Sequence, residues 1–409
     1  MSSNLEYDVI TVGGGLGGAA TALALASAGL EVLALDAGPP PKPTETFDGR
    51  AYAVAQASLA FWRAVGVWDR IADKAQPMVD ILVSDGRVSE GASSLFLHFD
   101  HREIEGGTFG QMIEDHHLRP AAMAAMADHP SITQRFDARV TTTKAEPGRT
   151  VATLADGTTV AAALIIACDG RESPLRSAAG IRRLAWSYPQ NGMVCAVSHE
   201  LPHHGIAQEL FLPAGPFAIL PLTGNRSSLV WTERTAEAQR IHALPDAAYL
   251  EELKDRFGDC LGEIALEGAR WTYPLHFSLA HDYVADRLAL TGDAAHAIHP
   301  IAGQGLNLGV RDAAALAEVL AEAMRQGEDI GAPAVLRRYQ QWRRFDSAAL
   351  AMATDSLNRL FSNDIGPIRA LRDLGLAAVN RAPGAKRFFM RAAAGMSGEV
   401  PRLMKGEPL

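Results

Sequence analysis

The chain has 409 residues, of which 48% are hydrophobic and 21% are charged, and its formal net charge is -9. This composition is typical of a globular protein with two or three domains, and the acidic balance argues against nucleic acid as the main partner. The longest uninterrupted apolar run, residues 160–168, is too short to cross a bilayer, so we expect no transmembrane helix.

Three cysteines, Cys168, Cys195 and Cys260, include no CxxC pair, which argues against a redox-active dithiol. The residues before Tyr7 contain neither a basic region nor an apolar stretch of the kind that directs export. We therefore expect reduced thiols and a cytoplasmic location.

The first predicted elements form a βαβ unit. Residues 7–12 and 31–35 are short apolar runs typical of buried parallel strands, and residues 19–28 form the helix between them. Asp36 ends the second strand, 18 residues after Gly18, where a carboxylate can bind ribose hydroxyls. The unit predicts dinucleotide binding and does not distinguish FAD from NAD.

The turn inside this unit has the pattern GxGxxG. Gly13 permits the tight turn, Gly15 lets a pyrophosphate approach the backbone, and Gly18 lets helix and strand pack closely. Leu16 and Gly17 lie inside the pattern, at the start of the helix, where free N–H groups and the positive end of the dipole favour phosphate. We predict that these five residues bind the cofactor.

The region from residue 53 to residue 167 alternates helices and strands. We predict, in chain order, a helix over 53–65, strands over 78–84 and 95–99, a helix over 118–128 with Pro120 in its first turn, a hairpin of 139–144 with 150–154, and a buried strand over 164–167.

Residues 193–233 have the pattern of short strands separated by turns, and residues 271–277 add a further strand. We interpret them as a second, mostly antiparallel sheet inserted into the first domain. Its aromatic residues Phe211, Phe217 and Trp231 are predicted to form a wall for a substrate, although aromatic residues on alternating strands also form ordinary cores.

A third motif follows the predicted strand 288–290. Gly292 and Asp293 form a turn at its end, where an acid can accept hydrogen bonds from the ribityl hydroxyls of FAD, which NAD lacks. An N-cap aspartate is the alternative, and both roles are compatible. Together with the glycine turn, Asp293 favours FAD.

Two further glycines, Gly303 and Gly305, precede a predicted helix over 306–325, and a second helix is predicted over 334–360. Their backbone N–H groups suit the negative charge that reduced flavin develops near N1 and O2. An ordinary helix entry is the alternative. The other cofactor-binding residues predicted in this loop are Pro300, Gln304, Leu306 and Asn307.

The histidines give weaker signals. His296 and His299 are candidates for acid–base catalysis, although packing and loop shape explain them equally well. The pairs His116–His117 and His203–His204 lack metal-like spacing with acids, so we predict that they are solvated and that the protein has no metal site.

Five segments carry a resemblance to a known family. They are GGGLGG from Gly13, DGRESPLR from Asp169, GDAAHAIHPIAGQGLNLGVRDAAAL from Gly292, YQQWRR from Tyr339 with Thr354–Asp355, and PRLM from Pro401. The chain resembles the class A FAD-dependent aromatic hydroxylases with the para-hydroxybenzoate hydroxylase fold, and within them the ubiquinone-biosynthesis hydroxylases.

The resemblance implies further site residues. In that family the DG segment lies near FAD and the nicotinamide cofactor, which here gives Asp169, Gly170 and Arg176; a capped turn with an exposed arginine is the alternative. The family also places two arginines near FAD, and Arg50 and Arg119 match their positions, although either could be a plain surface residue.

The resemblance also implies a fold: a Rossmann-like α/β FAD-binding domain with an inserted, mostly antiparallel substrate sheet and C-terminal helices. The predicted boundaries are 1–75, 101–183 and 284–365 for the FAD-binding domain, 76–100 and 184–283 for the substrate domain, and 366–409 for a basic helical tail.

The implied reaction starts when NADH or NADPH reduces FAD. The reduced flavin then reacts with O2 to a C4a-hydroperoxide, which hydroxylates an aromatic ring. The implied substrate is a polyprenylated phenol of ubiquinone biosynthesis. Two alternatives stay open: a related FAD oxidoreductase acting on another aromatic or isoprenoid substrate, and a non-catalytic FAD-containing scaffold of a biosynthetic complex.

Residues 366–409 contain eight basic and three acidic residues, a local charge of +5 in an acidic protein. This tail could lie on the inner face of a membrane, where a prenylated substrate resides, or dock a partner protein. A solvated helix pair is the alternative. The apolar residues between its charges are Phe388, Phe389, Met390, Met396, Leu403 and Met404.

Overall fold

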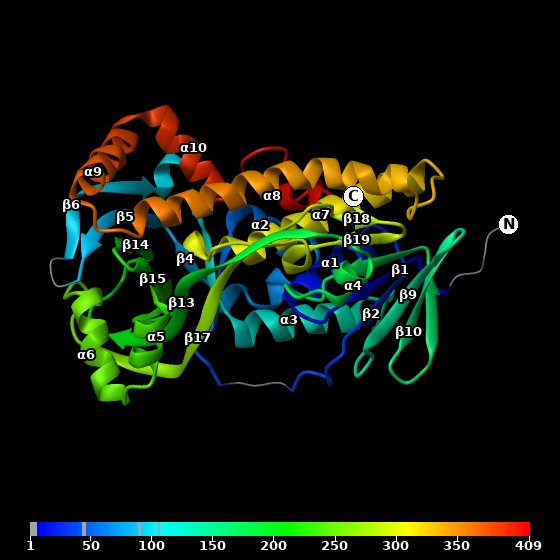
Figure 1. The fold of residues 1–409 in the computed structure, drawn as a ribbon, viewed down its shortest axis with the longest axis horizontal. Helices are drawn as coiled ribbons and strands as arrows, with labels where there is room; N and C mark the ends of the chain where they lie inside the picture. The colour runs from blue at the N-terminus through cyan, green and yellow to red at the C-terminus, as the bar shows by residue number, and fades with distance from the viewer. Residues whose placement is uncertain (1–5, 43–45, 89–90, 105–106) are drawn as a thin grey trace.

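Two large sheets at opposite ends of an elongated molecule organise the chain (Figure 1). The computed structural model describes residues 6–42, 46–88, 91–104 and 107–409. The long helix α8 (Pro333–Phe361) runs along both halves and joins them. Among the described residues, no helix combines the length and the apolar character needed to cross a lipid bilayer.

The first sheet has six strands and contains the predicted βαβ unit. Its central strand β1 pairs in parallel with β12 on one side and β2 on the other. The helices α1 (Leu16–Ser27) and α7 (Gln304–Arg325) pack against it in the main apolar core. In spatial order the strands are β18 (Val284–Ala285), β19 (Leu288–Leu290), β12 (Leu164–Ala167), β1 (Val9–Val12), β2 (Val32–Leu35) and β8 (Ile132–Arg135).

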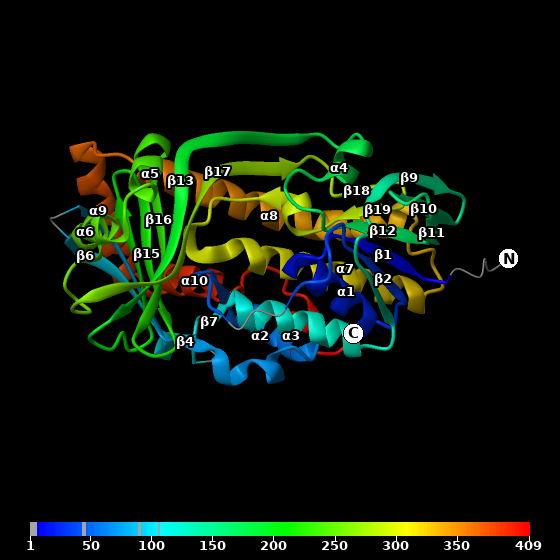
Figure 2. The same cartoon turned by 90° about the horizontal axis from the view of Figure 1, so that it is seen from below.

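The second sheet has eight strands, and every neighbouring pair except β14 with β5 is antiparallel. Its strands β13 and β17 are 17 residues long and extend from this sheet towards the first one (Figure 2). In spatial order the strands are β20 (His296–Ala297), β17 (Ile264–Ala280), β13 (Arg183–His199), β16 (Arg226–Arg234), β15 (Gly215–Leu222), β14 (Ile206–Leu212), β5 (Asp80–Arg87) and β6 (Gly91–Asp100).

The two faces of this sheet have different neighbours. One face packs on α5 (Thr235–His242) and α6 (Asp246–Phe257) in a separate apolar core. The opposite face packs on residues of a small third sheet, such as Ala51 and Met112. This small sheet and the first sheet belong to the half of the molecule that carries the predicted cofactor segments, called the cofactor half below. Because side chains alternate along a strand, this arrangement assigns each residue of β14, β15 and β16 to one side.

Two small sheets complete the fold. The sheet β3–β7–β4 is part of the cofactor half and faces the second sheet, and β9–β11 form the predicted hairpin with an added strand. Their strands are β3 (Ala51–Ala55), β7 (Gly110–Glu114), β4 (Gln76–Met78), β9 (Val140–Glu146), β10 (Arg149–Leu154) and β11 (Thr159–Ala162); the helices beside them are α2 (Gln56–Ala64), α3 (Asp115–Asp128) and α4 (Pro174–Ala178).

Two predictions in this region are wrong in detail. The helix expected over 53–65 begins only at Gln56, because Ala51–Ala55 pair with β7 as a strand. Helix α3 begins three residues earlier than predicted, so Pro120 lies inside the helix and not in its first turn. A proline at such a position removes one backbone hydrogen bond and crowds the carbonyl oxygen four residues before it.

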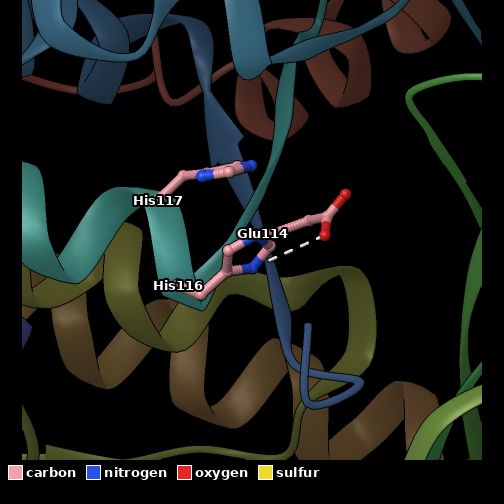
Figure 3. Close-up of side chains that lie close together, drawn as sticks. All are labelled: Glu114, His116 and His117. Atoms are coloured by element: carbon pink, nitrogen blue, oxygen red, sulfur yellow. Dashed lines mark ion pairs between the residues drawn. The ribbon is translucent and has the colours of Figure 1, made fainter. Parts of the chain in front are cut away.

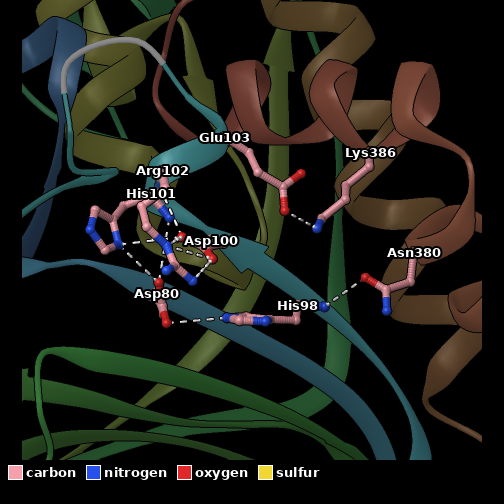
Figure 4. Close-up of polar contacts among 8 residues, drawn as sticks. All are labelled: Asp80, His98, Asp100, His101, Arg102, Glu103, Asn380 and Lys386. Carbon is pink, nitrogen blue, oxygen red and sulfur yellow. Dashed lines mark hydrogen bonds and ion pairs between the residues drawn. The ribbon is translucent and has the colours of Figure 1, made fainter.

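The C-terminal tail is docked on both halves of the molecule and is not a freely solvated helix pair. Its helices are α9 (Gly366–Arg381), α10 (Pro383–Ala393) and α11 (Arg402–Lys405). Arg372 forms a buried ion pair with Asp85, at 2.9 Å. Lys386 donates to Glu103 at 2.6 Å, and Asn380 accepts from the backbone of His98, which lies among the charged residues of β5 and β6 (Figure 4).

Several of the tail's apolar residues are therefore unavailable to a membrane. Met390, Leu403 and Met404 are buried, and the last two belong to the main core of the cofactor half. Phe388 and Phe389 remain exposed.

Candidate active site

The three predicted cofactor segments meet at one edge of the first sheet. Each follows the carboxyl end of a strand, β1, β12 or β19, and these strands are parallel neighbours. The Thr291 hydroxyl lies 3.1 Å from the Cys168 sulfur and 3.3 Å from the Thr21 hydroxyl. The carboxyl ends of parallel strands are where ligands bind in α/β sheets.

The glycine turn has the geometry that its pattern requires. A Cβ at Gly13, where φ is +118°, would lie 2.3 Å from the Cys168 carbonyl oxygen, and a Cβ at Gly18 would lie 1.8 Å from the Gly13 oxygen. A Cβ at Gly15 or Gly17 would meet no atom within 4 Å. Since no side chain caps α1, its first N–H groups stay available to a phosphate.

Asp36 lies directly over the turn, because a Cβ at Gly14 would be 1.7 Å from its Oδ2. Its Oδ1 accepts from the Gly38 N–H at 2.9 Å. The carboxylate also lines a small cavity, whose other walls include Met123 and Met126 of α3. Arg119 is one helical turn before Met123 on the same face of that helix, and it does not line this cavity.

Arg176 in the DG segment is 3% exposed, so the exposed-arginine alternative is wrong. Its Nη1 donates to the carbonyl oxygens of Arg171 and Ala294, both at 2.9 Å, and thereby ties the second cofactor segment to the third. Asp169 accepts from the Leu175 N–H at 3.2 Å, and its Oδ1 is buried without a partner. Burial raises the pKa of Asp169. A Cβ at Gly170 would meet no atom within 4 Å.

Asp293 is exposed, and its carboxylate has no hydrogen-bond or ion-pair partner among the described residues. Although the residue is exposed at the surface, the protein around its carboxylate desolvates that group and raises its pKa, while His296 and Arg171 act to lower it. The hydroxyls of a ribityl chain would supply the donors that this carboxylate lacks. Asp293 does not act as a side-chain N-cap of the short helical turn that contains it.

His296 has a structural role in this loop. Its Nε2 lies 2.5 Å from Asp312 Oδ2, which also accepts from the Gly292 N–H at 3.0 Å. Asp312 Oδ1 accepts from Arg343 Nε at 2.8 Å, and neither charged side chain is exposed. Burial alone would raise the pKa of Asp312. The charges and hydrogen bonds of His296 and Arg343 have the larger effect, so the pKa of Asp312 is lowered. Sequence reasoning missed Asp312 and Arg343, whose partners are distant in the chain.

Asn307 shapes the loop before α7. Its Oδ1 accepts from the Ala55 N–H at 2.9 Å, and its Nδ2 donates to the carbonyl oxygens of Ala53 and Gly303. Gly303 adopts a left-handed conformation, with φ of +60°, and its Cβ would be 3.1 Å from that of Ala53. The Asn307 amide is therefore committed to the protein, whereas space is open beside Gly305.

The other predicted residues of this loop have mixed surroundings. Leu306 is partly buried against the main core, Pro300 is partly exposed, and Gln304 is the first residue of α7.

His299 is fully buried, and both of its ring nitrogens lack a hydrogen-bond partner among the described residues. Its ring meets Tyr188 of β13 edge-on, with the centroids 5.2 Å apart. Tyr188 in turn donates to Asp355 of α8 at 2.7 Å. Burial lowers the pKa of His299 to about 4, so the side chain is neutral at pH 7. It cannot donate an imidazolium proton there.

We expect this buried histidine to make stability pH-dependent. Because its folded pKa lies below the ordinary value near 6.5, the unfolded chain binds the proton first, and stability falls as pH drops from about 6.5 to about 4. His299→Leu should remove up to about 3 kcal/mol of that pH-dependent loss. Urea unfolding across this range measures it, with the exposed His281→Leu as control; an unchanged pH profile in His299→Leu would contradict the assignment.

Arg50 and Arg119 meet around one buried carboxylate. Asp115 lies 3.2 Å from Arg50 Nη2 and 3.0 Å from Arg119 Nη2, and it also accepts from the Tyr52 hydroxyl at 2.8 Å. Arg50 additionally lies over the ring of Trp271 in β17, 5.2 Å from its centroid. The two predicted arginines are thus brought together where the cofactor half contacts the second sheet.

The histidine pairs are not simply solvated, and one lies beside an acid. Glu114, His116 and His117 place their ligand atoms within 4.8 Å of one another (Figure 3). However, Glu114 already binds Arg226 at 2.8 Å, and Lys74 and Arg70 line the adjoining pocket. These positively charged side chains disfavour the binding of a metal cation, so the absence of a metal site stays our prediction. His203 accepts from the Gly205 N–H within its own turn.

The predicted aromatic wall is wrong for two of its three residues. Phe217 and Trp231 are buried in the core beneath α5 and α6, on the face of the sheet turned away from the cofactor half. Phe211 points the other way and packs with Ile301 of the cofactor loop and Phe361 of α8. Period-two alternation put these residues on opposite faces, and both faces are apolar.

Residues 6–354 match the protein family described as FAD binding domain. The chain belongs to this family of FAD-binding monooxygenases. It is 46% identical to ubiquinone hydroxylase UbiL of Rhodospirillum rubrum, over 100% of this chain and 95% of that protein. It is 34% identical to 3-demethoxyubiquinol 3-hydroxylase of Escherichia coli, over 96% of this chain and 100% of that protein.

The fold is also shared with a solved structure. The crystal structure of p-nitrophenol 4-monooxygenase PnpA from Pseudomonas putida DLL-E4 has a TM-score of 0.76 at 20% identity, covering 96% of this chain and 98% of that chain. The predicted fold class, with a Rossmann-like FAD-binding part and an inserted antiparallel sheet, is confirmed.

The site fits FAD on structural grounds as well. The open space beside Gly15, the uncapped start of α1 and the unpartnered carboxylate of Asp293 lie in segments joined through Cys168 and Thr291. These features supply donors for a pyrophosphate and acceptors for hydroxyls, the groups that FAD presents. Which atoms touch the cofactor stays a prediction.

Proposed function

We propose that this protein is an FAD-dependent monooxygenase that hydroxylates the aromatic ring of a polyprenylated phenol in ubiquinone biosynthesis. The observation that carries the proposal is the convergence of the three cofactor segments at one sheet edge, opposite the apolar face of a second sheet. The names of the relatives, which include ubiquinone and 3-demethoxyubiquinol hydroxylases, support the substrate class.

When bound, FAD accepts a hydride from NADH or NADPH and, once reduced, activates O2 to insert one oxygen atom into the ring. We assign the first N–H groups of α1 to the pyrophosphate and the carboxylate of Asp36 to the ribose. Asp293 would hold the ribityl chain. The N–H groups near Gly303 and Gly305 would stabilise negative charge on the pyrimidine edge of the flavin.

Arg176, His296 and Asn307 serve these contacts indirectly. Arg176 joins the DG segment to Ala294, His296 holds the loop to Asp312, and Asn307 fixes the entry into α7. The backbone N–H groups of loops held in this way need not rearrange when charge develops on the cofactor. Such preorganised donors are the condition for electrostatic stabilisation.

Turnover of the purified, FAD-loaded protein tests the proposal. NADH- or NADPH-driven O2 uptake that yields one hydroxylated product per reduced nucleotide supports it. Reduction of FAD without ring hydroxylation would favour another oxidoreductase activity. Bound FAD with no turnover towards any prenylated phenol would favour the scaffold alternative.

We further propose that α9 and α10 rest on an anionic lipid surface, where a prenylated substrate is dissolved. Leu371 and Leu374 of α9 are 70% and 62% exposed, and Phe388 of α10 is 63% exposed. Arg381 at the end of α9 and Arg387 of α10 are exposed as well. Apolar side chains next to arginines are the combination that binds the interface of an anionic bilayer.

Replacing Leu371, Leu374 and Phe388 together by serine should reduce flotation with vesicles of anionic phospholipid by about tenfold or more, since each buried side chain contributes roughly 1.5–3 kcal/mol. Leu201→Ser, at an exposed position in the loop between β13 and β14, should leave flotation unchanged. Equal flotation of the triple variant and the wild type would refute the proposal that α9 and α10 bind the membrane.

A further inference from the structure

One carboxyl group of the second sheet points towards the cofactor half without a partner. In β14, Gln208 and Leu210 lie on the side of α6: Leu210 packs on the core beneath that helix, and Gln208 donates to Cys260. Ala207 and Phe211 belong to clusters on the opposite side. Because side chains alternate along a strand, Glu209 shares the side of Ala207 and Phe211.

The two neighbours of Glu209 on this side reach the same cofactor loop from two directions. Phe211 packs with Ile301, two residues before Gly303. Ala207 belongs to the cluster that includes Ala53, whose Cβ adjoins Gly303 and whose carbonyl accepts from Asn307. Each neighbour is about 7 Å from Glu209 along the strand. Glu209 therefore faces the loop to which we assign the flavin edge.

Glu209 has no hydrogen bond or ion pair with any described residue, although it is half-buried. Its cross-strand neighbours are Val83 of β5 and Ala218 of β15, which offer no polar side chain. The nearest charged residue on this side of β5, Asp85, is already paired with Arg372. Burial alone raises the pKa of Glu209 to about 7.

Burying a carboxyl group on an apolar wall destabilises the protein unless a hydrogen-bond partner compensates for the lost water. In the proposed reaction the substrate is a phenol, whose ring hydroxyl is a donor. Asp293, whose carboxylate also has no partner among the described residues, belongs instead to a cofactor-binding segment.

We propose that Glu209 accepts a hydrogen bond from the ring hydroxyl of the aromatic substrate and so orients the ring towards the flavin. The assignment makes Glu209 a substrate-binding and specificity-determining residue of the active site, and it rests on the proposed hydroxylase function. A site built to bind a hydroxyl discriminates strongly against an analogue that lacks the donor.

The test compares two probes, a phenol with a short prenyl chain and its methyl ether, which keeps the ring and loses the donor. With wild-type holoenzyme, we expect the phenol to bind about tenfold or more tightly than the ether, by the change in flavin absorbance. In Glu209→Leu this preference should fall to near unity. KM for the phenol should rise about tenfold, and more reduced nucleotide should be lost to hydrogen peroxide.

Glu209→Gln keeps an acceptor oxygen and should retain most of the preference, which a merely structural role would not predict. Gln208→Leu, on the same strand but the other face, is the matched control and should behave as wild type. If Glu209→Leu does not fold with FAD, Glu209→Gln and Glu209→Asp are compared instead, and a wild-type phenol KM in Glu209→Asp would then refute the proposal.

The two proposals fail in different ways. If the wild type does not hydroxylate the phenol, the proposed function fails. If the wild type hydroxylates it and Glu209→Leu keeps the same KM and the same preference over the ether, only the role of Glu209 is overturned.

Discussion

Replacement of Gly15 by valine should abolish FAD binding while the apoprotein stays folded. Gly15 has extended backbone angles, with φ of -70° and ψ of 177°, which any residue adopts, and its Cβ would meet no protein atom within 4 Å. The added side chain would therefore collide only with the bound pyrophosphate. We expect the dissociation constant for FAD to rise at least 100-fold, roughly 3 kcal/mol, in a fluorescence titration of the apoprotein.

Gly18→Ala is the matched control, because its Cβ would lie 1.8 Å from the Gly13 oxygen and strain the protein itself. We expect Gly18→Ala to lower the free energy of unfolding of the apoprotein, whereas Gly15→Val should lower it by no more than the roughly 1 kcal/mol of a poorer helix cap. Tight FAD binding by Gly15→Val would show that the cofactor does not lie over this turn.

The second large effect is expected at Asp312. Asp312→Ala leaves Arg343 buried without its closest counterion and frees both His296 and the Gly292 N–H. Removing one partner of a buried ion pair typically costs about 3–5 kcal/mol, so we expect a loss of that size in the free energy of unfolding. The FAD content should also fall, because the loop that carries Asp293 loses its anchor.

The pH dependence has a definite sign. Because the folded pKa of Asp312 is lowered, its contribution is present above the unfolded value near pH 4 and is lost as the pH falls through the folded pKa. Urea unfolding of the apoprotein at pH 7 and in acid measures the loss of stability in Asp312→Ala and its dependence on pH. The exposed Asp282→Ala is the control. A free energy of unfolding within 1 kcal/mol of wild type in Asp312→Ala would contradict this account.

The local parts of the fold could be predicted because their causes lie within a few residues. The glycine turn requires close approach at Gly13 and Gly18, and the strand before it and the helix after it are set by short apolar runs. The order of the three cofactor segments likewise predicted their meeting, since parallel strands place their carboxyl ends on one edge.

The parts that could not be predicted depend on contacts between distant residues. Phe217 and Phe211 look alike in sequence, and only the helices over one face of the sheet determine which of them meets the cofactor half. The ion pair of Arg372 with Asp85 fixes the tail, although neither residue signals the other. Glu209 reads as an ordinary exposed residue of a strand until the face it shares with Phe211 is known.

The central claim is that this chain uses FAD and O2 to hydroxylate a prenylated phenol. Its most direct test is turnover of the purified holoenzyme with a short-chain prenylphenol, NADH or NADPH, and isotopically labelled O2, followed by mass spectrometry of the product. The account predicts one labelled oxygen atom on the aromatic ring. A ring product without the label, or reduced nucleotide consumed without any ring product, would contradict it.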